Sequence, residues 1–121
     1  MRIAVVGSRG WTDEQAIKRY IDSLPTGSVI ISGGASGVDS MAEKHARARG
    51  LEVVVFEADW SKGNDAGAKR NAVIVANSDV VVAFWDGKSK GTMITVDMAL
   101  KAAHIQRVTV VKKAQEGQGN E

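Results

Sequence analysis

The sequence predicts one α/β domain in which a parallel sheet is covered by helices on both faces. The length of 121 residues suits a single domain with its own hydrophobic core. Five short apolar runs alternate along the chain with stretches of helical periodicity. This alternation is typical of a doubly wound sheet whose strands are joined by right-handed crossovers.

The five predicted strands are rich in β-branched residues, and their apolar positions do not alternate cleanly with polar ones. This pattern is typical of strands that are buried on both faces of a parallel sheet. The strands are predicted over residues 3–6, 29–31, 53–56, 80–84 and 108–111.

The stretches between the strands carry the apolar spacing of amphipathic helices. Before the first of them, Thr12 and Gln15 are spaced as a capping box, which predicts the start of that helix. Apolar stripes run over residues 17–24 and 38–46, and two further helices are predicted over residues 66–76 and 92–103.

The composition is that of a globular domain, with 44% hydrophobic and 25% charged residues. The chain holds no cysteine, which excludes disulfides and thiolate metal sites. The N-terminal apolar run is too short for a signal peptide or a membrane span, so we expect a cytoplasmic protein without a membrane partner. The net charge of +2, with scattered lysines and arginines, neither favours nor excludes nucleic acid. We expect residues 1–113 to form the domain and the polar residues 114–121 to form a flexible tail.

Glycine-rich segments follow three of the predicted strands, at residues 7–10, 32–37 and 87–92. In an open parallel sheet, ligands bind outside the carboxyl ends of the strands, and all three segments lie at that edge. Glycine lets a backbone approach a ligand closely, and N–H groups at the start of a helix attract phosphate. The alternative is that the glycines only allow tight turns. The segments match neither G-x-G-x-x-G with a following acid nor the P-loop pattern. We therefore expect a phosphate site, but neither an ordinary dinucleotide oxidoreductase nor a P-loop NTPase.

The connection over residues 59–67 is long and polar, and it leads to Arg70 and Asn71 near a helix start. A planar guanidinium at such a position is a good phosphate partner, and a solvated surface arginine is the alternative. Tryptophans are predicted in loops at the ligand edge at Trp11, Trp60 and Trp85. Of these, Trp60 and Trp85 are candidates for stacking on a base, with packing or an oligomer interface as the alternative.

Four segments together carry a family resemblance and span most of residues 3–111. They are Val6-Gly7-Ser8-Arg9 with Trp11; Ser32 to Asp39 followed by Ala42; Ala58-Asp59-Trp60 through Ala66-Gly67 to Arg70-Asn71; and Phe84 to Thr92. In this order they resemble the SLOG superfamily, the Rossmann-like group that joins the DNA-processing protein DprA to the LOG phosphoribohydrolases. The similarity is greatest to its small stand-alone members related to YspA. Together with the strand–helix alternation, the resemblance implies a five-stranded parallel sheet in the order 3-2-1-4-5.

In the fourth segment, some positions resemble the LOG enzymes and others resemble DprA. LOG enzymes cleave the N-glycosidic bond of nucleoside monophosphates, and they carry a Gly-Thr pair, two following glutamates and an arginine on the preceding helix. Gly91 and Thr92 match the pair, and Arg70 matches the arginine. Ile94 and Thr95 stand in place of the glutamates, which makes this segment more similar to that of DprA. The resemblance therefore implies phosphate binding without the LOG carboxylates.

Two aspartates are candidates to replace the missing glutamates if the protein is an enzyme. In that case Asp39 or Asp86 would act together with Arg70 as catalytic residues. Asp39 follows Ser36 by three residues, so helix capping is the alternative to contact with a ribose hydroxyl or a metal. His, Asp and Glu residues nowhere show metal-ligand spacing, and we expect no metal and no cofactor.

The leading functional prediction is a protein that binds a nucleotide or a nucleotide derivative, of the sensor or sequestering type. The alternatives are a nucleoside 5′-monophosphate N-glycosidase of the LOG type and single-stranded nucleic acid binding of the DprA type, for which the slightly basic chain would have to oligomerise to build a groove. The fourth predicted helix is apolar over much of its circumference, so we expect a homodimer or a higher homo-oligomer. The candidate ligand-binding residues are Gly7, Ser8, Arg9, Gly33, Gly34, Ala35, Ser36, Gly37, Asp39, Trp60, Arg70, Asn71, Trp85, Ser89, Gly91 and Thr92.

Overall fold

The structure, a computed structural model, describes residues 1–112 of the chain. Within these residues the chain forms a five-stranded parallel sheet in the order β3-β2-β1-β4-β5, which confirms the predicted topology. The predicted polar tail at residues 114–121 lies outside the described residues. The strands are β1 (Arg2–Gly7), β2 (Val29–Ser32), β3 (Glu52–Val55), β4 (Val80–Trp85) and β5 (Arg107–Lys112).

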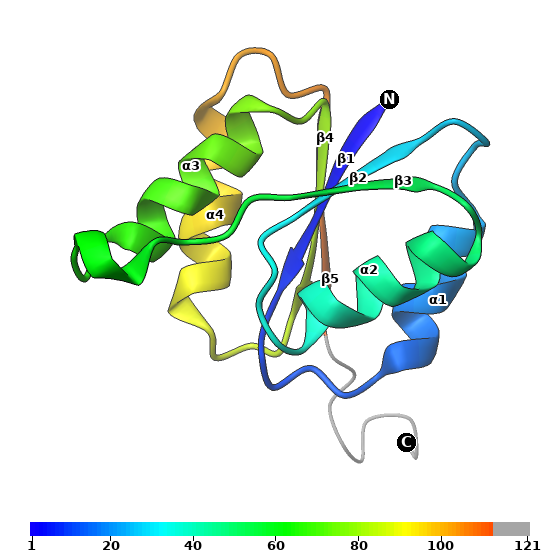
Figure 1. Ribbon diagram of the computed structural model, residues 1–121, viewed down its shortest axis with the longest axis horizontal. Helices are drawn as coiled ribbons and strands as arrows, with labels where there is room; N and C mark the ends of the chain where they lie inside the picture. Colours follow the sequence, from blue (N-terminus) through cyan, green and yellow to red (C-terminus); the bar gives the residue numbers. More distant parts are fainter. Residues whose placement is uncertain (113–121) are drawn as a thin grey trace, which may run out of the picture.

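Two helices cover each face of the sheet, as Figure 1 shows. The third helix has the predicted bounds, and the fourth begins before the predicted residue 92 because Ser89 caps it. A short 3-10 helix, which the sequence patterns do not predict, lies in the long connection after β3. The helices are α1 (Glu14–Asp22), α2 (Val38–Ala48), η1 (Trp60–Lys62), α3 (Ala66–Ala76) and α4 (Lys90–Lys101).

Alternate side chains of the central strands fill two separate halves of the core. Along β1, Ile3 and Val5 pack on the side of α1 and α2, while Ala4 and Val6 pack on the side of α3 and α4. All four are buried, as expected for a strand with both faces covered. The central strands β1 and β4 are therefore anchored from both sides, and their carboxyl ends form a fixed base for the loops that follow.

Trp11 lies in the loop after β1, as predicted, but its side chain is directed into the core and does not face a ligand site. Its side chain is buried and makes an edge-to-face contact with Phe84 at 5.4 Å between ring centroids. Its indole N–H donates to the backbone oxygen of Asp13 at 2.8 Å, which satisfies the polar atom of the ring. Trp11 therefore fixes the chain between β1 and α1 and contributes no surface for a ligand.

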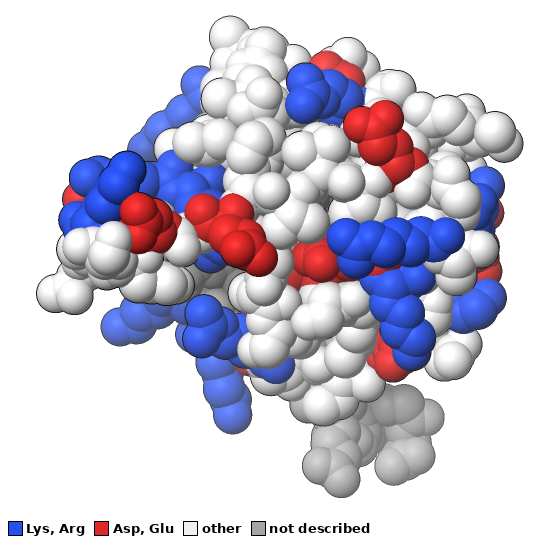
Figure 2. All heavy atoms as spheres, viewed as in Figure 1, with Lys and Arg blue, Asp and Glu red and all other residues white. Residues whose placement is uncertain are grey.

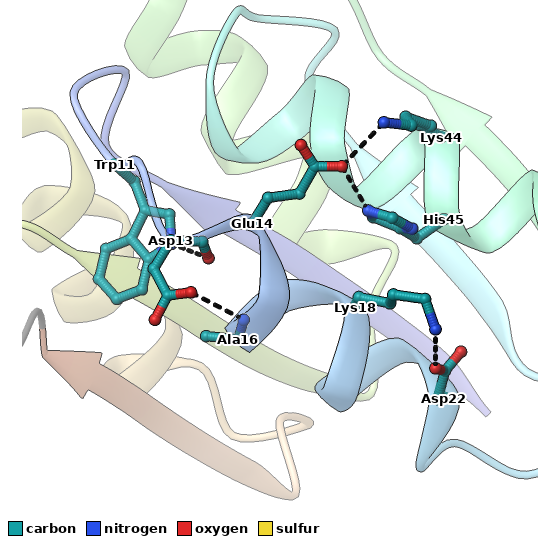
Figure 3. Close-up of polar contacts among 8 residues, drawn as sticks. All are labelled: Trp11, Asp13, Glu14, Ala16, Lys18, Asp22, Lys44 and His45. Carbon is teal, nitrogen blue, oxygen red and sulfur yellow. Dashed lines mark hydrogen bonds and ion pairs between the residues drawn. The ribbon is translucent and has the colours of Figure 1, made fainter.

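The start of α1 also differs from the predicted capping box. Asp13 is the N-cap, and its carboxylate accepts the N–H of Ala16 at 3.2 Å (Figure 3). Glu14 Oε2 in the first turn accepts hydrogen bonds from Lys44 Nζ at 2.8 Å and contacts His45 Nε2 at 2.7 Å, both on α2. These two contacts lower the pKa of Glu14 and tie α1 to α2. An aspartate that caps directly makes the Thr12 and Gln15 pair unnecessary.

None of the helices within residues 1–112 combines the length and the apolar character that crossing a membrane requires.

Candidate functional site

A cleft opens at the carboxyl edge of the sheet, where β1 and β4 lie side by side. The chain leaves β1 toward α1 on one face and leaves β4 toward α4 on the other, so the two loops diverge and leave a crevice between them. The cleft has a volume of about 540 Å³, and a second cavity of about 280 Å³ adjoins it. The walls come from α2, α3, the start of α4 and the loop after β1.

Hydroxyl groups tie the loop after β1 to the start of α4. Ser8 Oγ, which is buried, accepts the N–H of Asp86 at 3.1 Å and lies 3.5 Å from Thr92 Oγ1. Ser89 Oγ accepts from Thr92 twice, from the backbone N at 3.3 Å and from the hydroxyl at 3.0 Å. The side chains of Ser8 and Thr92 are thus engaged within the protein, and they position the backbone that forms one wall of the cleft.

Arg70 on α3 reaches toward the loop after β2. Its Nη1 donates to the backbone oxygen of Gly33 at 2.6 Å, and its Nε donates to Asn71 Oδ1 at 2.7 Å. A guanidinium has five N–H donors in a planar fork. These two bonds fix the plane of the group, and the remaining donors stay at the wall that the two cavities share.

Asp39 on α2 is a buried carboxyl group that lines the cleft near Arg70. Its Oδ2 accepts the N–H of Ala35 at 3.2 Å. Burial raises the pKa of Asp39 to about 6, against the opposing effects of the Ala35 hydrogen bond and the Arg70 charge. The N-cap of α2 is Gly37, and the exposed Ser36 precedes it. Ser36 and Asp39 therefore do not form the capping box that was the alternative to ligand contact.

Asp86 is a carboxylate of a different kind. Its Oδ1 accepts the backbone N–H groups of Lys88 and Ser89, each at 2.9 Å. These hydrogen bonds lower the pKa of Asp86, so it is ionised and shapes the turn that leads into α4. The cleft therefore holds one carboxyl group that titrates near pH 6 and one that stays charged.

The two candidate stacking tryptophans lie in different surroundings. Trp85 is the last residue of β4 and not a loop residue as predicted, because β4 extends one residue further than expected. Its indole N–H donates to the backbone oxygen of Ser89 at 3.0 Å, and Lys112 Nζ lies 6.0 Å from the centre of its ring. Trp60 lies in η1, is 59% exposed and lines the second cavity. Of the two, Trp60 offers a ring surface to a cavity.

The structure brings most of the sequence-predicted residues together. The larger cleft is lined by Gly7, Arg9, Ala35, Asp39, Arg70, Asn71, Asp86, Ser89, Gly91 and Thr92. The second cavity adds Gly33, Gly34 and Trp60. Within residues 1–112, the predicted residues that line neither cavity are Ser8, Ser36, Gly37 and Trp85.

Sequence reasoning missed several lining residues, among them Glu57, Gly67 and Ile74. Glu57 follows β3 at the same edge as the glycine-rich segments, so its position after a predicted strand was a usable signal. Gly67 and Ile74 lie on α3, and the face of α3 that borders the cleft depends on how the helix is rotated against the sheet. No local pattern in the sequence determines that rotation.

Comparison with known proteins places the chain in a family. The family described as YAcAr, the YspA, cpYpsA-related SLOG family, matches residues 1–63. The Gene 61 protein of Mycobacterium phage D29 is 37% identical over 112 residues, which cover 84% of this chain and 90% of that protein. The chain belongs to the YspA, cpYpsA-related SLOG family. An uncharacterized protein of Archaeoglobus fulgidus is 32% identical over 115 residues, covering 84% of this chain and 74% of that protein.

Two solved structures of DNA processing protein A share the fold of this SLOG protein. The Streptococcus pneumoniae protein matches with a TM-score of 0.82 at 19% identity, over 98% of this chain and 52% of that chain. The Helicobacter pylori protein matches with a TM-score of 0.78 at 22% identity, over 96% of this chain and 67% of that chain. The latter structure is described as showing a single-stranded DNA binding mode. The chain thus spans about half the length of the pneumococcal protein.

Proposed function

We propose that this SLOG protein binds a nucleotide or nucleotide derivative in the larger cleft, as a sensor or sequestering protein. The observation that carries the proposal is the position of the Arg70 guanidinium, which two hydrogen bonds fix at the wall of a cleft formed by the β1 and β4 loops. A fixed, planar guanidinium can bind two phosphate oxygens at once. The phosphate would therefore lie beside Arg70.

The size and lining of the cleft support this ligand class. A volume of about 540 Å³ falls inside the range of roughly 300–1,000 Å³ that is common for small-molecule sites. Arg9 and Lys88 add positive charge to the walls, and Ile74 and Ile94 add apolar surface for a base or sugar. The first turn of α4 also borders the cleft, where backbone N–H groups favour an anion.

Substitution of Arg70 tests the proposal. Calorimetric titration with the four nucleoside 5′-monophosphates should show an affinity loss of roughly tenfold to hundredfold in Arg70→Ala, because a hydrogen bond to a charged group is removed. Arg70→Lys should recover only part, since a point charge cannot reproduce the planar fork. Lys69→Ala is the matched control, because Lys69 is the adjacent residue of α3, is exposed and pairs with Asp65 at 3.3 Å.

The fold should survive in Arg70→Ala, because Arg70 lies at the rim of the sheet and outside both halves of the hydrophobic core. Circular dichroism and thermal unfolding check this. If none of the phosphate-bearing probes binds the wild type, or if Arg70→Ala binds them equally well, the site is misplaced.

A second candidate function, hydrolysis of the N-glycosidic bond of a nucleoside 5′-monophosphate, is favoured by Asp39. Its carboxyl group lines the cleft near Arg70 and has a pKa of about 6, which suits a group that exchanges protons near neutral pH. Incubation with nucleoside monophosphates must then release free base, and Asp39→Asn or Asp86→Asn must abolish the release. Simple binding predicts intact nucleotide after incubation, as chromatography would show.

The DprA fold neighbours favour a third candidate, binding of single-stranded nucleic acid. Against this candidate, positive and negative side chains are interspersed over the face seen in Figure 2, and the net charge is only +2. Fluorescence anisotropy with a labelled oligonucleotide at several salt concentrations tests it, since binding through phosphates weakens steeply with salt.

We also propose that the protein forms a homodimer or a higher homo-oligomer through α4. Leu100 on this helix is 67% exposed and lies outside the lining of the cleft, whereas the exposed Ile94 borders the cleft. Light scattering at tens of micromolar, on the order of common weak-interface affinities, should show a mass above that of one chain. A monomer at that concentration contradicts the proposal.

A further inference from the structure

The second cavity adjoins the larger cleft and shares part of its wall. Three residues line both spaces, namely Arg9, Ala35 and Arg70. Two of the three carry a positive charge. An anion held by these arginines would therefore lie between two spaces, with room for a chemical group on either side.

The second cavity is unsuited to a phosphate of its own. Glu57 lines it, and the glutamate side chain lies against Gly34, where a Cβ atom would be 3.3 Å from Glu57 Oε1. An ionised carboxylate repels phosphate and accepts hydrogen bonds only. The group that fits is neutral and offers N–H or O–H donors, as a nucleobase amino group or a ribose does.

Trp60 gives the second cavity an aromatic wall. The indole is 59% exposed. Leaving an apolar ring of this size in water is less favourable than burying it. It is nevertheless held in place: Asp59 accepts the N–H of Ser61 at 3.2 Å, which builds the η1 turn, and a Cβ at Gly67 would lie 3.0 Å from the Trp60 ring. A fixed and exposed indole beside a cavity is a stacking surface for a base.

We propose that the ligand consists of two nucleosides joined through phosphate. One nucleoside occupies the larger cleft, the linking phosphate lies at Arg9 and Arg70, and the second base stacks on Trp60 with its donors toward Glu57. This inference rests on the proposed function and extends it from one nucleotide to two. The same chemistry exists in a free dinucleotide and in one step of a single-stranded nucleic acid, and the experiment separates the two sources.

The experiment compares short and long probes on the full chain by calorimetry. The probes are the four nucleoside 5′-monophosphates, the matching symmetric dinucleotides with a 5′,5′-diphosphate link, and the matching 3′,5′-linked dinucleoside monophosphates. Wild type should bind one linked class at least tenfold more tightly than the best monophosphate, because the second base stacks. Preference for the diphosphate link indicates a free dinucleotide, and preference for the 3′,5′ link indicates a nucleic acid strand.

Trp60→Ala should remove most of that gain and leave the affinity for the monophosphate within about twofold. Trp60→Phe should restore part of the gain, since a smaller ring still stacks. Lys62→Ala is the matched control, because Lys62 belongs to the same turn, is exposed and lines neither cavity among the described residues.

The possible failures point to different errors. If linked and single nucleotides bind equally, or if Trp60→Ala weakens the monophosphate as much as the linked probe, the two-nucleoside ligand is wrong and nucleotide binding stands. If Arg70→Ala changes nothing, or no probe binds the wild type, the proposed function itself fails and the extension fails with it.

Discussion

Two glycine-rich loops border the cleft, and they hold their glycines for different reasons. In the loop after β2, the protein itself excludes a side chain. A Cβ at Gly33 would lie 2.7 Å from Arg70 Nη1, and Gly37 has φ +80 with the backbone of Arg9 at 2.8 Å from the Cβ position. At Gly37 the positive φ and the backbone of Arg9 leave no room for a side chain, whereas at Gly33 the neighbouring atoms are the ends of the Arg70 and Asp39 side chains.

In the loop after β4, the last glycine has no such explanation. Gly91 lies in the first turn of α4, has no positive φ, and an added Cβ would meet no atom within 4 Å among the described residues. Alanine is the better helix former at such a position. Gly91 is one of the residues that line the cleft.

The comparison shows when a glycine indicates a ligand. A glycine that the turn requires is present with or without a ligand, so Gly37 carries little functional information. Neither the backbone conformation nor a neighbouring atom of the described residues requires a glycine at Gly91, which lines the cleft. The following predictions test this distinction, in order of the expected effect on stability.

Gly37→Ala should be the most damaging change. The left-handed backbone strains an L-residue, and the methyl group collides with the loop after β1, so we expect a loss of about 4 kcal/mol from these two effects together. Urea unfolding measures the loss. A variant as stable as wild type would show that the loop can adopt another path, and the glycines would then need a different explanation.

Asp39→Asn should stabilise the protein without ligand. Because burial raises the pKa from 3.8 to about 6, the charged form weakens the folded state by up to about 3 kcal/mol above pH 6. The asparagine carries no charge and can still accept the N–H of Ala35. This prediction extends the comparison from the glycines to Asp39, a buried carboxyl group in the first turn of α2.

The pH dependence follows from the same shift. Between about pH 4 and pH 6 the folded state binds more protons at Asp39 than the unfolded state, so wild-type stability should fall as pH rises through this window. Asp39→Asn should lack this part of the decline. Asp97→Asn, an exposed site on α4, is the control and should follow the wild-type curve. Parallel curves for wild type and Asp39→Asn would show that the carboxyl group is not desolvated.

Gly91→Ala should change the free energy of unfolding least, and it should raise it, whereas Gly37→Ala should lower it. We expect a gain of up to about 1 kcal/mol in unfolding experiments, because alanine replaces glycine in a helix. Affinity for the nucleotide should fall, because the methyl group occupies the cleft. Lys90→Ala, in the same turn but not among the residues within 1–112 that line the cleft, should leave the affinity nearly unchanged. An unchanged affinity in Gly91→Ala would place the ligand away from α4.

The fold could be predicted because its determinants are local. Runs of β-branched residues and helical spacing gave the elements, and the strand order followed with the help of the family resemblance. Trp11 could not be placed in this way, because a tryptophan after a strand has the same sequence context whether it points inward or outward. Its burial depends on the position of α1 above the sheet.

The sequence predicted most residues of the site, but it did not predict that the site is divided into a larger cleft and a second cavity. Strand ends and glycines brought Arg70, Asp39 and Gly91 to one edge. The second cavity depends on the η1 turn, on the rotation of α3 under Trp60 and on the side chain of Glu57, all of which are tertiary features. Likewise, the pKa of Asp39 follows from burial, which the sequence alone does not reveal.

The hydroxyl contacts among Ser8, Ser89 and Thr92 have a consequence for motion. They join the end of β1 to the first turn of α4, so this wall of the cleft behaves as one rigid block. The opposite rim, from Glu57 to Asp65, is held chiefly by a short turn and by the contact of one ring with α3. We therefore expect any adjustment to a ligand to be smaller in the block than in this rim. Amide hydrogen exchange should accordingly slow on ligand binding in the rim, while the amides of the block are protected from the outset.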